Sequence, residues 1–132
     1  MGSERAGGKA GLMNSREKGA RGERELAKAL RSHGYDCRRG QQYCGANGDA
    51  DVVGLPGIHI ECKYVEHLGL MAAMSQAIGD SKAGEMPAVM HRKKYCPWLV
   101  TMRLDDWIEI YREWEAGQTL KNAPERAEEI QS

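Results

Sequence analysis

One aspartate and a Glu-x-Lys triplet, Asp51 and Glu61-Cys62-Lys63, combine residue types that can cleave a phosphodiester bond. Carboxylate oxygens bind hard cations such as Mg²⁺. Such an ion can polarise a phosphodiester and stabilise the charge that develops on it. A lysine two residues after the second carboxylate can orient or deprotonate the attacking water. The pattern alone is of low specificity, because an ordinary ion pair between Glu61 and Lys63 on an exposed sheet surface would give the same spacing.

Two short strands joined by a turn must position these residues. Residues 51–55 and 58–63 read as strands, and Pro56-Gly57 between them is a turn signal. The second strand alternates, with one face formed by Ile58, Ile60 and Cys62 and the other by His59, Glu61 and Lys63.

The register of this hairpin decides whether Asp51 can meet Glu61. A strict two-residue turn would pair Leu55 with Ile58 and Asp51 with Cys62. Directly paired residues share a face of the sheet, so Asp51 would then point away from Glu61. A metal site therefore requires a longer turn, or a bulge that shifts the pairing by one residue.

A third carboxylate, Glu23, lies on the apolar stripe of the first predicted helix. That helix is expected to begin at Asn14 as N-cap, with Glu17 as capping-box partner, and to stop at Gly34. Glu23 shares a face with Leu26 and Leu30. A carboxylate in such a stripe must be paired or must bind something. The simpler alternative is a glutamate at the helix edge that reaches water or an arginine.

The remaining elements complete an α/β pattern. A strand is expected at residues 35–39, a helix at 68–83, and strands at 86–91 and 98–103. A last helix begins at Asp105-Asp106, and its expected buried stripe is Leu104, Trp107, Ile108, Tyr111 and Trp114. The order αβββαββα predicts a mixed central sheet of four to five strands flanked by helices. The hairpin must be antiparallel, and the crossover helix allows a parallel pair.

The 132 residues suffice for one domain, which we place at residues 14–115. Residues 1–13 read as a flexible arm or an appended leader, and residues 116–132 as a polar tail. Neither a signal peptide nor an apolar stretch of membrane-spanning length is evident. The four cysteines form no Cys-x-x-Cys pair, which favours reduced thiols in a cytoplasm. A zinc site from Cys37, Cys44, His91 and Cys96 is a much weaker alternative.

The formal charge of zero is a cancellation between two parts of the chain. Residues 1–103 hold 16 Lys and Arg against 11 Asp and Glu, whereas residues 104–132 hold 3 against 8. A basic body of this kind suits a polyanion such as duplex DNA. The candidate DNA-binding residues are Arg16, Lys18, Arg21, Arg24, Lys28, Arg38, Arg39, Arg92, Lys93 and Lys94.

Three segments in order carry a family resemblance: Lys18-Gly19-Ala20-x-x-Glu23-Arg24-Glu25-Leu26, Asp51-Val52-Val53 and Ile60-Glu61-Cys62-Lys63. Together they resemble the PD-(D/E)XK nuclease superfamily, and within it the archaeal-type Holliday junction resolvases and their phage-encoded relatives. The resemblance covers about residues 16–66 and implies a restriction-endonuclease-like core. One departure is Ala50, because the family pattern has proline before the aspartate.

The resemblance implies a role for each matching residue. Asp51 and Glu61 would be the central metal ligands, joined by the backbone carbonyl of Cys62, and Glu23 would complete the site. Lys63 would position the attacking water and the scissile phosphate. Gln76 on the following helix is a possible accessory residue, and Asp49 a rival ligand. The implied cofactor is Mg²⁺, with Mn²⁺ able to substitute, and no organic cofactor is expected.

The expected function is therefore a Mg²⁺-dependent, structure-selective endodeoxyribonuclease that cuts branched DNA during phage or prophage recombination, in the cytoplasm of a bacterial host. Two symmetric cuts call for a homodimer. Met90, Trp98, Trp107 and Trp114 could supply its interface, or could simply fill the core. Two alternatives stay open: a nuclease of the same fold for linear duplex, flap or single-stranded DNA, and a non-catalytic DNA-binding module. No membrane partner is expected.

Overall fold

The structure is a computed structural model that describes residues 2–41 and 50–131, with side chains for residues 16–41 and 50–122. It divides into two compact units, Met1–Met102 and Arg103–Ser132. No helix among the described residues combines the length and the apolar character that a membrane span needs.

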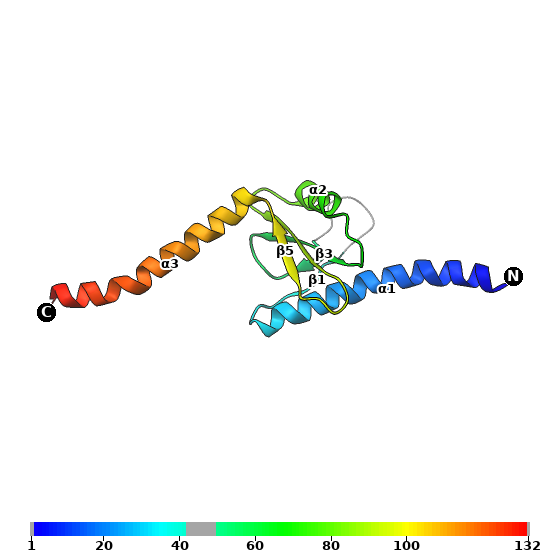
Figure 1. The fold of residues 1–132 in the computed structure, drawn as a ribbon, viewed down its shortest axis with the longest axis horizontal. Coiled ribbons are helices and arrows are strands. Elements are labelled where there is room, and N and C mark those ends of the chain that lie inside the picture. Colours follow the sequence, from blue (N-terminus) through cyan, green and yellow to red (C-terminus); the bar gives the residue numbers. More distant parts are fainter. Residues whose placement is uncertain (1, 42–49, 132) are drawn as a thin grey trace. The chain divides into compact units, whose positions relative to one another are not determined.

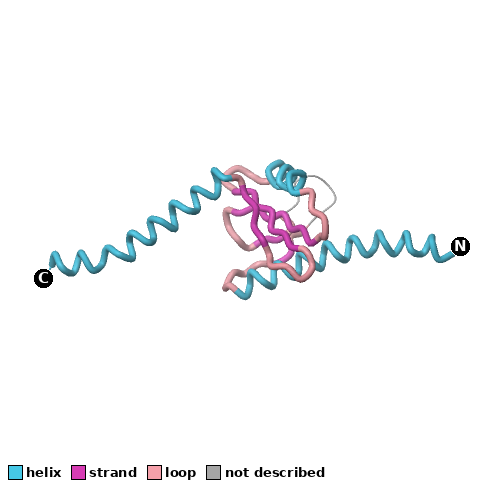
Figure 2. The backbone as a smooth tube through the Cα atoms, in the orientation of Figure 1, coloured by secondary structure: helices cyan, strands magenta, loops and turns pink. Residues whose placement is uncertain are grey.

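The first unit is a mixed five-stranded sheet with helices (Figures 1 and 2). Its elements are α1 (Gly2–Ser32), β1 (Arg38–Arg39), β2 (Val52–Val53), β3 (Ile58–Tyr64), α2 (Leu70–Asp80), β4 (Met86–Arg92) and β5 (Leu99–Met102). Strand order follows chain order. Among the strands of the described residues, β3 and β4, joined through α2, are parallel, and the other neighbouring pairs are antiparallel. With α3 (Leu104–Gln131) the order is the predicted αβββαββα, and the fold is restriction-endonuclease-like.

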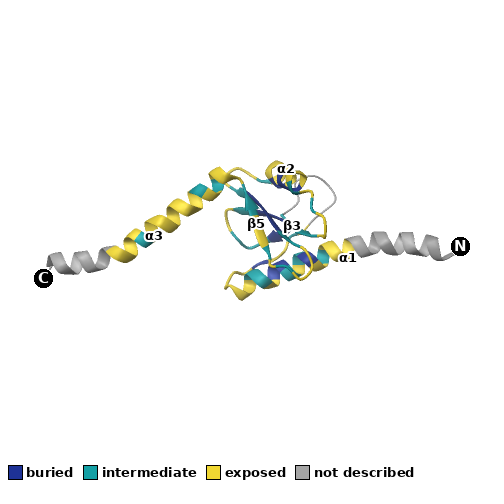
Figure 3. Ribbon diagram, in the orientation of Figure 1, coloured by how far each residue is buried: buried dark blue, intermediate teal, exposed yellow. Residues whose placement is uncertain are grey.

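The sheet separates two small hydrophobic clusters because side chains alternate along its strands. Leu26 and Ala27 of α1 pack against Ile60, Cys62 and their neighbours in one cluster. Ala73, Met74 and Ala77 of α2 pack against Val89 in the other. Figure 3 shows the resulting dark band of buried residues along the central strands and on α1 and α2. The buried face of α2 is narrower than its sequence suggests, since Met71 and Ile78 are exposed.

The β2–β3 hairpin adopts the shifted register. Val52 pairs with Ile60, one residue away from the pairing that a two-residue turn would give. Gly54 makes this path possible, because its φ of +119° is unfavourable for other residues and a Cβ would lie 2.7 Å from the Cα of Cys37. The Ile58 N–H then donates a 3.1 Å hydrogen bond to the Leu55 carbonyl. The register that a metal site requires is therefore confirmed.

Both terminal helices are longer than predicted. The first begins at Gly2, not at Asn14, since residues 2–13 contain no proline to stop it. Its predicted end is confirmed by Gly34, which has a φ of +97°. The helix α3 continues through most of the predicted polar tail. The domain boundaries themselves stay predictions.

The expectation of a buried stripe on α3 is wrong. Of these residues Leu104, Trp107, Tyr111 and Trp114 are exposed, and only Ile108 is half-buried. Figure 3 shows that most of the described part of α3 is exposed. The physical reason is that a lone helix has no second layer within its own unit to cover an apolar face. Met90 and Trp98, in contrast, do contribute to the core of the first unit.

Candidate active site

The shifted register brings two buried carboxylates together. Extending the Val52–Ile60 pairing by one residue places Asp51 opposite Glu61 on the same face of the sheet. Asp51 is 9% exposed and Glu61 only 4%. The Cys62 N–H donates a 2.9 Å hydrogen bond to Asp51 Oδ2, which fixes the orientation of that carboxylate. The hairpin thus builds an acidic pair that water reaches poorly.

The surroundings of Glu61 disfavour the ionised form of its carboxyl. Burial and then the neighbouring Asp51 raise the pKa of its carboxyl, and Lys63 lowers it, with a net rise to about 7. Lys63 Nζ lies 3.5 Å from Glu61 Oε1, and about a third of the Lys63 side chain is exposed. One lysine opposes two carboxylates here, so a cation bound between them would relieve the excess negative charge.

Glu23 approaches the same acidic pair from α1. Burial raises the pKa of its carboxyl, Arg39 lowers it, and the Asp51 carboxylate raises it again. The Arg39 Nε–H donates a 2.8 Å hydrogen bond to Glu23 Oε2. The arginine pairing that was the simpler alternative is therefore present, together with the proximity to Asp51 that a metal site needs.

A glycine next to Glu23 permits this approach. A Cβ on Gly22 would lie 2.7 Å from the Cβ of Tyr64, closer than side-chain atoms pack. The helix α1 can therefore come to the end of β3 at this turn, and it carries Glu23 with it.

The backbone of Cys62 faces the site. Its N–H points to Asp51, and the N–H and C=O of one strand residue point to the same side. Burial raises the pKa of the Cys62 thiol, with Asp51, Glu23 and Glu61 adding to the shift. The sulfur is therefore protonated at neutral pH, which leaves the carbonyl oxygen as the ligand that Cys62 can offer.

Most of the candidate DNA-binding residues are exposed on the first unit. Arg16, Lys18, Arg21, Arg24, Lys28, Arg38, Arg39, Lys93 and Lys94 are exposed, and Arg92 is half-buried. The Arg92 guanidinium lies 5.6 Å from the Tyr64 ring centre and 5.9 Å from that of Trp98. A pocket of about 200 Å³ is lined in part by Lys63, His91, Arg92 and Lys93. Part of the basic set therefore adjoins the proposed catalytic lysine.

The other sequence candidates have no described contact with the site. Gln76 is exposed on α2, and no described contact joins it to Asp51 or Glu61. Asp49 and Cys44 fall outside the described residues. Cys37, Cys62 and Cys96 are free thiols. The grouping of described residues that could hold a metal ion contains no cysteine, so the zinc alternative gains no support.

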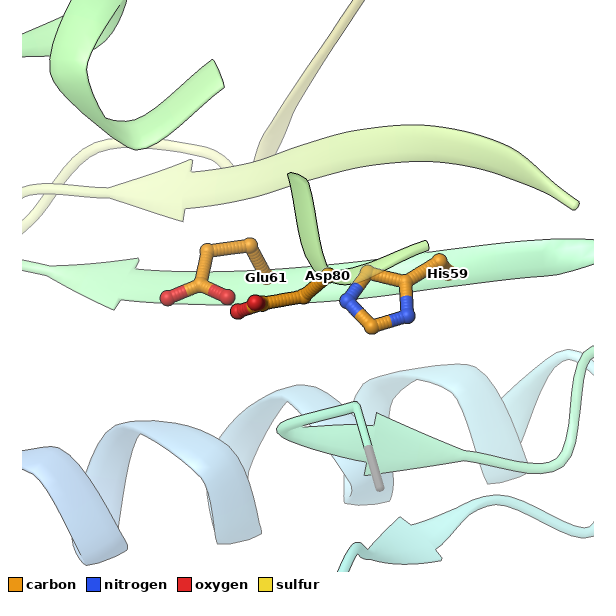
Figure 4. Close-up of side chains that lie close together, drawn as sticks. All are labelled: His59, Glu61 and Asp80. Carbon is orange, nitrogen blue, oxygen red and sulfur yellow. The ribbon is translucent and has the colours of Figure 1, made fainter. Parts of the chain in front are cut away.

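Two residues near Glu61 were not assigned a role by the sequence. Ligand atoms of His59, Glu61 and Asp80 lie within 4.8 Å of one another (Figure 4). The strand alternation had placed His59 on the face of Glu61, which is a usable signal. Asp80 gave none, because only the packing of α2 on the sheet brings its last residue near β3.

Comparison with known proteins gives the family. No curated protein matches the chain. A family model described as "Phage putative PDDEXK endonuclease" matches residues 14–128. The match spans Glu23, Asp51, Glu61 and Lys63 and extends well past residue 66. The chain therefore belongs to this phage PDDEXK endonuclease family, a member of the PD-(D/E)XK nuclease superfamily.

Proposed function

We propose that this chain is a Mg²⁺-dependent, structure-selective endodeoxyribonuclease that hydrolyses phosphodiester bonds in branched DNA such as Holliday junctions. The supporting observation is the one-residue register shift, which sets Asp51 against Glu61 with Lys63 3.5 Å from the latter. A purely DNA-binding domain has no use for two opposed buried carboxylates, whose desolvation is costly.

The donor set suits a hard cation. Asp51, Glu61, Glu23 and the Cys62 carbonyl offer oxygen ligands, which Mg²⁺ prefers and Mn²⁺ also accepts. A bound ion would supply Lewis-acid polarisation of the phosphate and a more acidic water. The Lys63 ammonium would hold the attacking water and the scissile phosphate in line. Arg39 would keep Glu23 oriented through its 2.8 Å hydrogen bond.

The exposed basic residues would bind the DNA backbone. Contacts from arginine and lysine to phosphates give affinity without sequence readout. Arg92 is favourable for this because the rings of Tyr64 and Trp98 hold its guanidinium in place. Paired cuts across a junction need two active sites, so the proposal includes a homodimer acting in the cytoplasm of the bacterial host.

The catalytic assignment is tested by cleavage of a four-way junction in Mg²⁺. Asp51→Asn, Glu61→Gln and Lys63→Ala should each lower the cleavage rate by about 100-fold or more while DNA binding persists. Asp36→Asn, an exposed acid of the same unit, serves as the matched control and should cut normally. Normal cleavage by any of the first three variants would refute the assigned site.

The substrate assignment is tested by a parallel panel of four-way junction, flap, linear duplex and single-stranded DNA. Symmetric paired nicks confined to the junction are expected. Equal cutting of every substrate would contradict junction selectivity and favour a general nuclease. Junction binding without cutting, unchanged in Lys63→Ala, would favour the non-catalytic module.

A further inference from the structure

A second group of metal-ligating side chains lies beside the proposed catalytic site. His59 and Glu61 project from β3, and Asp80 is the last residue of α2. Figure 4 shows the Asp80 carboxylate between the imidazole and the Glu61 carboxylate. One ligand atom from each lies within 4.8 Å of the other two. A cation with ligand distances of about 2.1 Å draws its ligands to roughly 3–4 Å from one another, which small side-chain rotations would achieve.

The His59 side chain is almost fully buried, yet no hydrogen bond to its ring is found among the described residues. His59 is 4% exposed, and its contact with Glu85 is an ion pair with Oε1 3.9 Å from Nδ1, beyond hydrogen-bond length. The ring nitrogens are not among the buried side-chain atoms that lack a partner, so they keep some access to the pocket that His59 lines. A ring nitrogen that is accessible and not hydrogen-bonded to the protein is free to bind an ion.

An opening reaches two members of this group, His59 and Asp80. A pocket of about 220 Å³ is lined in part by Ala50, His59, Asp80, Lys82 and Glu85. Asp80 is exposed at its rim, whereas His59 and Glu61 are buried. An ion could therefore reach the imidazole from solvent without a change in the sheet.

We propose that His59, Glu61 and Asp80 form a second divalent-cation site that shares Glu61 with the catalytic one. Imidazole with two carboxylates favours a transition-type ion, such as Mn²⁺ or Zn²⁺, over Mg²⁺. A neutral histidine and two carboxylates carry a charge of −2, which a divalent ion neutralises. Glu61 would then bridge two ions, one held with Asp51 and the other with His59 and Asp80. The assignment rests on these three side chains and not on nuclease activity.

The site is tested by binding of Mn²⁺ to the full chain in the absence of DNA. Electron spin-echo spectroscopy of bound Mn²⁺ detects a coordinated imidazole through its ¹⁴N coupling. The coupling is expected in the wild type and in Asp51→Asn, because Asp51 is a proposed ligand of the catalytic site and not of the second one. His59→Gln should abolish it. Asp80→Asn should weaken this class of Mn²⁺ binding at least tenfold in calorimetry, and Asp36→Asn should leave both readouts unchanged.

Two results would overturn the proposal. One is a wild-type protein whose bound Mn²⁺ shows no nitrogen coupling. The other is coupling that survives in His59→Gln, since His33, His67 or His91 would then be its source. Asp80 is exposed, so Asp80→Asn keeps the test decisive even if His59→Gln fails to fold. A protein that shows the coupling but cuts no DNA would refute the nuclease assignment alone.

Discussion

Glu61 is the residue on which the demands of stability and chemistry conflict most. It is almost fully buried, faces Asp51, and has a single lysine to offset the two carboxylates. A glutamine would fill the same space without the charge. The ionised glutamate therefore lowers the stability of the metal-free protein. This is usual where a buried carboxylate binds a ligand.

This conflict predicts the pH dependence of stability. The carboxyl pKa of Glu61 rises from 4.5 to about 7 in the folded protein. The folded state thus holds the proton more tightly, and this contribution to stability is full below pH 4.5 and lost as pH rises through 7. In EDTA, Glu61→Gln should raise the free energy of unfolding by about 1–3 kcal/mol at pH 8 and by nearly nothing at pH 4.5.

Urea denaturation at a series of pH values measures this difference. Asp36→Asn is the matched control, because its side chain is exposed and its effect should not follow the same curve. The prediction is contradicted if Glu61→Gln raises the free energy of unfolding equally at all pH values, or lowers it at pH 8. Either result would show that ionised Glu61 does not destabilise the fold.

At the scale of the elements, the approach of α1 to β3 decides whether Glu23 reaches the site. Gly22→Ala would put a methyl group 2.7 Å from the Tyr64 Cβ, and either the helix or the strand would have to move. We expect a loss of roughly 1–3 kcal/mol in stability and at least a tenfold loss of cleavage, measured by denaturation and by the junction assay.

Gly19 supplies the control for this prediction. It lies one turn earlier on α1, and a Cβ there would meet nothing within 4 Å. Gly19→Ala should therefore be neutral, or stabilising by up to about 1 kcal/mol through helix propensity, with normal cleavage. Equal behaviour of the two variants would mean that close packing at Gly22 does not position Glu23.

The elements also show how far sequence reasoning could reach. Strand alternation and turn residues predict β2, β3 and their face pattern, because these signals are local. The register of the β2–β3 hairpin could not be predicted, and the sequence only showed which register a metal site would require. It depends on Gly54 passing close to the backbone of Asp36 and Cys37, a contact between segments that no local pattern reveals. Asp80 was missed for the same reason, whereas Glu23 stood out because a carboxylate interrupts an apolar stripe.

For the molecule as a whole, the neutral net charge conceals a basic body and an acidic last helix. The excess of 16 basic over 11 acidic residues lies in residues 1–103, and three of those acids are the proposed metal ligands Glu23, Asp51 and Glu61. One bound divalent ion would raise the charge of that part from +5 to about +7. Composition alone would have argued against a DNA partner, and the distribution along the chain argues for one.

The exposed aromatic face of α3 carries the last prediction, on assembly. The Trp107 and Tyr111 rings stack with centres 5.5 Å apart, and the Trp114 ring packs at a tilt on Tyr111, also at 5.5 Å, so the contacts run along two turns of the helix. Contiguous exposed aromatics usually mark an interface, and two symmetric cuts require a second copy of the chain. We therefore expect a dimer in sedimentation velocity, and a monomer for the double variant Trp107→Ser, Trp114→Ser. Glu109→Gln, on the opposite side of the helix by its 100° spacing, should remain dimeric. A wild type that is monomeric at all concentrations, or a dimer that survives the double variant, would remove α3 as the interface.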